Sequence, residues 1–477
     1  MTESEEQLVE NEPRANTISE LPGRKFNITM EIPLFVTMLS LSLTGAAMSN
    51  IILYRTCVHS LNHTRDECKV FLSLDKNNET QRLEKEVQAY ATFVSTVKSI
   101  IESLAPAVLS MFLGVWSDTH GRKPLVVWPL FGIAISSMLI VVYSLLDNLG
   151  PWWYILTVIP YSLTGGMTII FTGAYCYISD VSSSENRSLR MTILQASVSA
   201  GSVIGALLSA HVLRAVGNVY LLLLGAALNV FAYAFTNICL RESLTGAIEG
   251  RLSTVLDFLL VKEMIRECFK ERANFGRAQI LLLTFANSLS IFLMYGLFGL
   301  DYYYVREKLS WALKDYTLFS AVNTTISFFG GFLGVIVIQK LFGLSDLMFA
   351  NIAFVSALTE YIIKALAVKS WHMYLGAGVS LFKGLSAPLI RSLLTKILPI
   401  EDIAKVFALM SAIEGICPLL SPLLYNFVYE CTLSTLPSTI YILSACIVTI
   451  CIILVGIVQY FRWNCLQYQR LESGPTI

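Results

Sequence analysis

The sequence predicts an all-α membrane protein of twelve transmembrane helices in two six-helix bundles, with both termini in the cytosol. Three observations predict this fold class. Of the 477 residues, 55% are hydrophobic and only 14% are charged, whereas an average soluble domain is roughly 25% charged. The apolar residues fall in twelve blocks, each close to the about 20 residues that a helix needs to cross the hydrocarbon core. A charged segment over 241–276 separates six blocks from six.

The N-terminal part of the chain begins with a polar, acidic stretch over 1–29. This stretch lacks the basic start and apolar core of a signal peptide, so we expect a disordered cytosolic tail. The N-terminal bundle is expected over 30–240. Its six spans are predicted over 30–54, 89–114, 124–146, 152–178, 190–213 and 218–240.

The long loop over 55–88 is expected outside the cytosol. It carries glycosylation sequons at Asn62 and Asn78, which are used only on the extracytosolic side. Cys57 and Cys68 share the loop and can pair in an oxidising space, with Cys431 as the alternative partner.

The segment over 241–276 alternates acids and bases at a spacing that favours an amphipathic surface helix. The C-terminal bundle is expected over 277–461, followed by a cytosolic tail over 462–477. Lys and Arg gather on the side of the two termini, which is the cytosolic side by the positive-inside rule. The last six spans are predicted over 277–300, 316–340, 344–367, 371–395, 404–428 and 437–461.

The strongest local motif joins the second and third predicted spans. It combines Gly114, Asp118, Gly121, Arg122 and Lys123 within ten residues. Glycines permit a tight turn and close helix approach, and the acid can pair with a base. This spacing resembles the signature loop of the major facilitator superfamily. The resemblance implies a two-bundle transporter that works by alternating access, with Asp118 in a latch between conformations.

A narrower resemblance, to the proton-coupled folate transporter and thymic stromal cotransporter family, covers most of the chain. Folate-transporting members have a Glu, tied to proton coupling, where this chain has Gln195. They also have a His in the region of Tyr295, where this chain has none, so the match is to the broader family. The motifs that carry the resemblance are Glu31-Ile-Pro33, Leu53-Tyr-Arg55-Thr-Cys57, Leu113 to Leu125, Ala174 to Ser182, Arg187 to Met191 and Pro388 to Lys396.

Charged residues inside predicted spans are candidates for the solute or proton path, because a charge facing lipid is costly. Lys98 and Glu102 lie four apart and can pair, either in the path or as structural support. Lys383 lies near the middle of its span, where it can attract an anion, and Glu414 is its expected counter-ion or a proton carrier. The resemblance suggests a role for Arg391 near the solute path, and an interfacial anchor is the alternative.

A further acid and base, Glu360 and Lys364, lie four apart near one end of their predicted span. That span is normally peripheral in the superfamily, so an anchored surface pair is expected.

These features predict a secondary active transporter of a small, anionic organic solute, of folate or pterin type or related, driven by protons. A nutrient sensor that binds solute without moving it is the alternative. We expect no enzyme, cofactor, metal site or nucleic-acid partner, because no catalytic, Cys/His, nucleotide-binding or basic pattern occurs. We expect a monomer in the plasma membrane or an endolysosomal membrane, the latter because Tyr468 to Leu471 resembles a sorting signal.

Overall fold

The computed structural model describes residues 30–72, 81–183, 186–244, 257–298, 300–309, 311, 313–339, 341–432 and 436–472. Within these residues all regular structure is helical. The tail expected over 1–29 lies outside the described residues, as do the sequon at Asn78 and parts of the central segment and the C-terminal tail.

The N-terminal half contains the spans predicted from the first six apolar blocks. The chain turns at two glycines with positive φ, one within a span and one between two spans, and a residue with a Cβ adopts this conformation only at a cost. Gly165 has φ 90° and separates α5 from α6. Gly217 has φ 79° and breaks α7 into two spans. The helices are α1 (Glu31–Arg55), α3 (Gln81–His120), α4 (Pro124–Leu145), α5 (Tyr154–Leu163), α6 (Gly166–Val181) and α7 (Arg187–Cys239).

The C-terminal half repeats this all-helical pattern. Its spans include one sharply bent pair, α13 and α14, which meet at 42° across a short 3₁₀ turn, η8 (Lys383–Leu385). The helices are α9 (Gly276–Leu297), α10 (Leu300–Leu309), α11 (Leu313–Leu333), α12 (Asp346–Ala365), α13 (Ser370–Val379), α14 (Ser386–Ile397), α15 (Ile400–Thr432) and α16 (Thr439–Glu472).

The number of spans falls short of the twelve predicted. Among the described residues, ten helices are long and apolar enough to cross a membrane, or eleven if α13 and α14 form one span. The segment predicted over 316–340 forms α11 and a π-helical turn, η7 (Gly334–Gln339), and is not among them.

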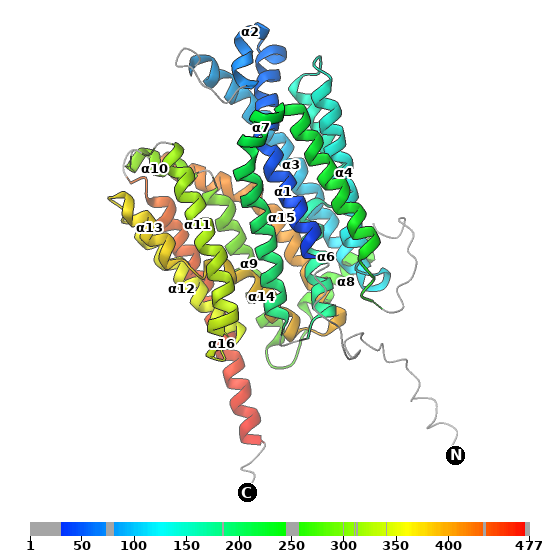
Figure 1. The fold of residues 1–477 in the computed structure, drawn as a ribbon. Coiled ribbons are helices and arrows are strands. Elements are labelled where there is room, and N and C mark those ends of the chain that lie inside the picture. The colour runs from blue at the N-terminus through cyan, green and yellow to red at the C-terminus, as the bar shows by residue number, and fades with distance from the viewer. Residues whose placement is uncertain are drawn as a thin grey trace, which may run out of the picture.

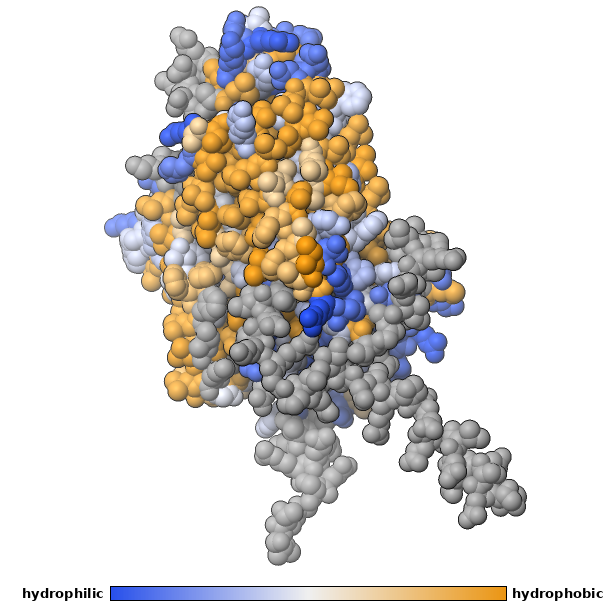
Figure 2. Space-filling model, turned by 45° about the vertical axis from the view of Figure 1, so that its right-hand side comes forward, coloured by the Kyte–Doolittle hydropathy of each residue, from blue (hydrophilic) through white to orange (hydrophobic). Residues whose placement is uncertain are grey.

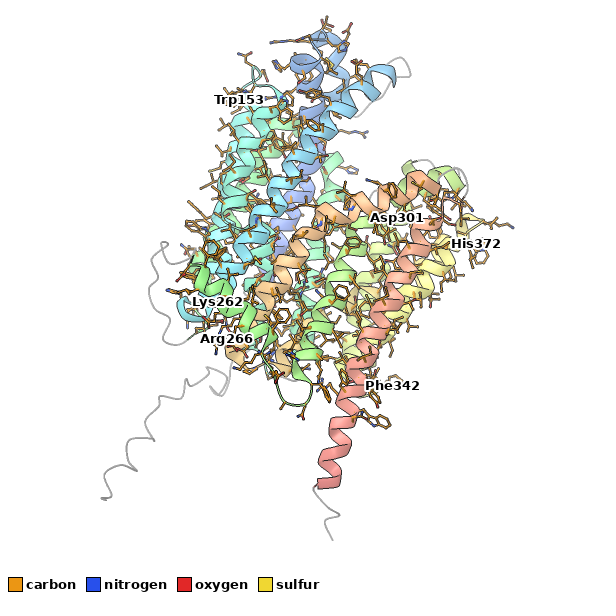
Figure 3. The ribbon with its side chains drawn as sticks, turned by 180° about the vertical axis from the view of Figure 1, so that it is seen from behind. Trp153, Lys262, Arg266, Asp301, Phe342 and His372 are labelled. Atoms are coloured by element: carbon orange, nitrogen blue, oxygen red, sulfur yellow. A yellow bond between two sulfur atoms is a disulfide. The ribbon has the colours of Figure 1, made fainter. Side chains whose placement is uncertain are left out.

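The two halves converge at one face of the molecule and diverge toward the other (Figures 1 and 3). α1 begins and α16 ends on the face where the halves meet, which we call the terminal face. The opposite face carries α2 (Arg65–Cys68), and we call it the loop face. The halves therefore adopt a conformation that is closed at the terminal face.

Close packing of small residues holds the halves together near the terminal face. A Cβ at Gly114 of α3 would collide with Ala408 of α15 and meet the Ala404 carbonyl oxygen at 3.1 Å. The side chain of Arg187 donates a hydrogen bond of 2.9 Å to the Thr395 carbonyl oxygen in the other half. A side chain at position 114 would therefore force α3 and α15 apart.

A helix of the central segment, α8 (Phe258–Phe269), lies against both halves at the terminal face. Asp257 caps it by accepting a hydrogen bond of 2.9 Å from the Leu259 N–H. Its Phe258 ring meets Phe112 of α3 with 5.7 Å between ring centroids. Its buried Cys268 contacts the Lys405 carbonyl oxygen of α15 at 3.8 Å. Lys262 and Arg266 are exposed on its other side (Figure 3).

The surface matches a chain surrounded by lipid. Figure 2 shows a broad hydrophobic band below a hydrophilic cap at the loop face. Large apolar side chains of α7 are exposed within the spans, including Leu207, Leu223 and Phe231. An aqueous environment would leave this surface unfavourably hydrated, whereas acyl chains solvate it.

A disulfide closes the start of the loop after α1. Cys57 and Cys68 are bonded, and both are fully buried. Cys431, the alternative partner, is a free and exposed thiol. Asn62 lies between the bonded cysteines with φ 56°, a conformation that Asn tolerates in turns.

Candidate functional site

A buried arginine lies where the two halves meet. Arg391 of α14 is 7% exposed, and its guanidinium donates to both carboxylate oxygens of Glu414 in α15, at 2.8 and 3.0 Å. The same guanidinium stacks over the ring of Tyr175 in α6, with 4.5 Å to the ring centroid. A cation held by a carboxylate of its own half therefore also contacts an aromatic ring of the other half.

Polar groups of both halves complete what we call the junction site, which consists of Arg391, Glu414, Tyr175, Gln195 and Asn287. The Tyr175 hydroxyl donates to Gln195 Oε1 of α7 at 3.2 Å. The Asn287 amide of α9 donates to Glu414. Every charge in the site has a partner, which offsets the cost of burial.

A cavity of about 110 Å³ lies next to the junction site, between α7 of the N-terminal half and α11, η8 and α14 of the C-terminal half. Gln195 and Thr192 line one wall, and Gly384 and Pro388 line the other. A group that enters this cavity meets both halves at once. Tyr295 of α9 is half-buried and interacts electrostatically with Glu414, so it lies near the same region.

The structure corrects the pairing expected for Lys383. Its partner is Glu360, with 2.9 Å between Nζ and Oε2, because Glu414 is taken by Arg391.

The expectation that Glu360 and Lys364 form an anchored surface pair is also wrong. Glu360 is fully buried, and its other oxygen lies 2.6 Å from Lys364 Nζ. Sequence spacing gave the Lys364 partner but not the one from another helix.

Glu360, Lys364 and Lys383 form a lysine cluster with two cations and one anion. Its Lys383 side chain is 34% exposed and lies in η8, at the break between α13 and α14. The Lys383 ammonium also sits 4.5 Å from the Tyr361 ring centroid. Gly384, the next residue, lines the cavity between the halves. The cluster therefore has one positive charge in excess at the edge of that cavity.

The predicted pair of Lys98 and Glu102 forms, with 2.7 Å between Nζ and Oε2. It does not join the junction site. It lines a separate cavity of about 320 Å³ that is enclosed by helices of the N-terminal half alone.

The signature loop forms a network of charges at the terminal face. Arg122 is buried, and its guanidinium lies 2.8 Å from Asp118 and 3.2 Å from Asp180 of α6. The backbone N–H groups of Arg122 and Lys123 donate to the Glu242 carboxylate at 2.7 and 3.0 Å. Gly121 turns the chain there with φ 101°.

Four residues of these networks were not predicted from the sequence as site residues: Tyr175, Asp180, Glu242 and Asn287. Asp180 lies in the last turn of α6, and Glu242 follows the end of α7. Both acids are predicted on the same side of the membrane as the bases of the loop, and this shared position could have indicated the contacts. Tyr175 and Asn287 carry no charge, and nothing in the sequence separates them from the other polar residues of their helices.

A family model confirms what this arrangement indicates. The model of the Major Facilitator Superfamily matches residues 34–359. The chain belongs to the major facilitator superfamily.

Curated relatives that are similar over most of the chain confirm the resemblance to the folate transporter family. A probable peptidoglycan muropeptide transporter, SLC46, of Drosophila melanogaster is 28% identical over 447 residues, or 91% of this chain and 86% of the relative. The proton-coupled folate transporter of Rattus norvegicus is 24% identical over 79% and 80% of the two chains. The lysosomal proton-coupled steroid conjugate and bile acid symporter SLC46A3 of Gallus gallus is 23% identical over 92% and 95%.

Solved structures show the same superfamily fold. The human organic anion transporter MFSD10 superposes with a TM-score of 0.69 at 13% identity, covering 90% of this chain and 98% of that one. The transporter FucP in its outward conformation superposes with a TM-score of 0.63 at 12% identity, covering 89% and 97%. This superfamily protein is therefore a multi-pass membrane protein whose relatives are solute transporters.

Proposed function

We propose that this protein is a secondary active transporter of a small organic anion, driven by a proton gradient and working by alternating access. The observation that supports the proposal is the place of Arg391. It is a buried cation at the contact between the two halves, held by Glu414 of its own half and by Tyr175 of the other. A solute anion that binds Arg391 therefore acts on both halves.

The conformation supports alternating access. The halves pack closely at the terminal face and diverge toward the loop face (Figures 1 and 3). With the terminal face in the cytosol, as the positive-inside rule predicts, this conformation opens outward. The hydrogen bond from Arg187 to the Thr395 carbonyl oxygen and the close contact of Gly114 with Ala408 join the halves at the cytosolic face.

The charge of the lysine cluster predicts that the solute is negatively charged. Its one excess positive charge lies beside the cavity between the halves, and Lys383 is its exposed member. Coulomb attraction in a site with little water favours anions over cations of similar size. A carboxylate or sulfate group is therefore the expected recognition element.

Exchange of partners at Arg391 couples the anion to a proton. When a solute anion takes Arg391, Glu414 loses its partner and becomes a buried, unpaired carboxylate. That state is unfavourable by several kcal/mol, and protonation of Glu414 relieves it. Gln195, at the position where folate transporters have a glutamate, cannot titrate, so in this proposal Glu414 is the proton carrier.

Uptake into proteoliposomes tests the proposal. The purified full-length protein is reconstituted and given radiolabelled folate, a sulfated steroid and a bile acid, at neutral pH and with an inward acid gradient. We expect accumulation of at least one anion, stimulated by the gradient. Binding of an anion without any flux would instead support the sensor alternative.

Two arginine variants sharpen this test. We expect Arg391→Ala to abolish accumulation, and Arg391→Lys to retain a small part of it, because a lysine keeps the charge but lacks the planar guanidinium with its fixed set of donors. Wild-type accumulation in Arg391→Ala would show that transport does not depend on the junction site.

We expect the protein to act as a monomer, in the plasma membrane or in an endolysosomal membrane.

A further inference from the structure

The larger of the two cavities lies inside the N-terminal half, away from Arg391. It measures about 320 Å³, and residues of α1, α3, α4, α5 and α7 enclose it. None of its lining residues comes from the C-terminal half. We call it the N-half cavity, and the proposed transport site makes no use of it.

The wall of the N-half cavity has no excess charge. Its charged lining residues are Lys98 and Glu102, which pair with each other at 2.7 Å. The Lys98 ammonium also lies 5.6 Å from the Tyr154 ring centroid. An occupant with a net charge would have to break this pair or remain without a counter-ion, and both are costly in a buried site. A neutral occupant avoids that cost.

Three hydroxyl groups of the lining residues already donate their protons to backbone carbonyl oxygens, so their oxygens remain as acceptors. Thr44 donates to the Ser40 carbonyl oxygen at 2.8 Å, and Thr157 donates to the Tyr154 carbonyl oxygen at 2.7 Å. Ser40 itself donates to the Gly225 carbonyl oxygen at 2.8 Å. Each hydroxyl oxygen keeps lone pairs for another donor.

A buried side-chain amide also calls for an occupant that donates hydrogen bonds. Asn229 of α7 lines the cavity and is 3% exposed. Its Oδ1 atom has no hydrogen-bond partner among the described residues. A buried acceptor without a donor costs about 1–3 kcal/mol, and an occupant with N–H or O–H groups would remove that cost.

We propose that the N-half cavity is a second binding site, and that it takes a neutral molecule rich in hydroxyl groups, such as a sugar or polyol. Three features select this class: a charge-balanced wall, hydroxyl oxygens free to accept, and the unpartnered Asn229 Oδ1. The rings of Tyr154 and Tyr161 give the wall an apolar part, as is usual for small-molecule sites.

The cavity is open along α1. Leu41 and Gly45 line it and are exposed. A Cβ built at Gly45 meets no atom within 4 Å. A leucine at this position therefore obstructs the opening without disturbing the packing of the helix.

Binding of neutral polyols to the full-length protein in lipid nanodiscs tests the proposal. Calorimetric titrations use glucose and inositol as probes, with propionate as the anion and choline as the cation. We expect saturable binding of a polyol and weaker or no binding of the two ions. Preferential binding of choline or propionate, or no binding of either polyol, would overturn the proposal.

Variants separate this site from the transport site. We expect Gly45→Leu to abolish polyol binding and Asn229→Ala to raise its Kd about tenfold, since one hydrogen bond is worth about 1.4 kcal/mol. Gly456→Leu in α16, where a Cβ also meets no atom within 4 Å, is the matched control and should leave the Kd unchanged.

Arg391→Ala should also leave polyol binding unchanged, even if it abolishes anion uptake. Loss of polyol binding in Arg391→Ala, or wild-type binding in both Gly45→Leu and Asn229→Ala, would contradict a site within the N-terminal half.

Discussion

At the scale of single residues, buried charges dominate the energetics of the C-terminal half. Glu360 is fully buried, and its two carboxylate oxygens lie 2.6 and 2.9 Å from the ammonium groups of Lys364 and Lys383. Neither lysine has another carboxylate in the lysine cluster, so this one side chain neutralises one of its two positive charges. A buried ion pair is costly to form but far more costly to break from one side.

The first prediction concerns this carboxylate. Glu360→Gln leaves two lysines without a counter-ion, and we expect a loss of about 3–5 kcal/mol of stability. The midpoint of thermal unfolding in detergent should fall sharply. Lys364→Met should cost less, because the remaining pair is balanced. An equal midpoint for Glu360→Gln and wild type would show that the lysine cluster does not stabilise the fold.

The second prediction concerns the proposed proton carrier. Glu414→Gln keeps the size of the side chain but removes the titrating group. Exchange of labelled for unlabelled anion across proteoliposomes should persist, while an inward acid gradient should no longer raise net uptake. If the gradient stimulates the variant as strongly as wild type, Glu414 is not the carrier.

Residue partners were predicted only within a helix. The spacing of four residues indicated the pairs of Lys98 with Glu102 and of Glu360 with Lys364, because residues four apart share one helix face. The partnerships of Lys383 with Glu360 and of Arg391 with Glu414 join different helices. Helix periodicity carries no information on which helices are neighbours, so these partners had to come from the structure.

At the scale of elements, breaks in the helices decide the geometry of the site. Lys383 and Gly384 lie where α13 and α14 meet at a bend of 42°, and Gly384 lines the cavity between the halves there. The sequence predicted one continuous span over this region, and only Pro388 and the nearby glycines hinted at a break. The spans separated at Gly217 were predicted as two, because polar residues around it interrupt the apolar pattern.

The third prediction concerns the network of the signature loop and α8. In the observed conformation, burial raises the pKa of Cys268 to about 12, so its thiolate fraction at neutral pH is small. Asp118→Asn removes a charge that attracts Lys405 of α15 in the other half, which should favour opening at the terminal face. Opening should expose Cys268, lower its pKa and speed its reaction with maleimide.

The labelling rate is measured in a protein whose other free cysteines are replaced by serine. At a given conformation the rate should rise with pH, because the thiolate is the reactive form. A rate for Asp118→Asn equal to that of the parent protein would contradict a latch function for the loop.

At the scale of the whole molecule, the protein consists of two halves that pack closely at the terminal face. Hydropathy predicted the all-helical class and the separation into halves, because long apolar blocks have few alternatives to spanning a bilayer. It also predicted twelve spans, of which ten, or eleven with the bent pair, are found among the described residues. The tilt of one half against the other depends on side-chain packing between helices, which hydropathy does not register.

The fourth prediction concerns orientation. With the loop face outside the cytosol, Asn62 should carry a glycan, and Asn62→Gln should shift the protein to a lower apparent mass on a gel before but not after enzymatic deglycosylation. A reporter fused to the C-terminal end should remain protected from added protease in intact cells. Digestion of that reporter would reverse the orientation proposed here.

The central claim is that the two halves move as bodies about the junction site. Spin labels at Trp153 and His372 report the loop face, and labels at Ile238 and Phe342 report the terminal face. Trp153, Ile238 and Phe342 are exposed and His372 is half-buried. Electron-spin distance measurements then compare the otherwise wild-type protein with Gly114→Val, in which the added side chain forces α3 from α15. The account predicts that the variant shortens the loop-face distance and lengthens the terminal-face distance together. If the terminal-face distance increases while the loop-face distance stays the same, the halves do not rock and the alternating-access account is wrong.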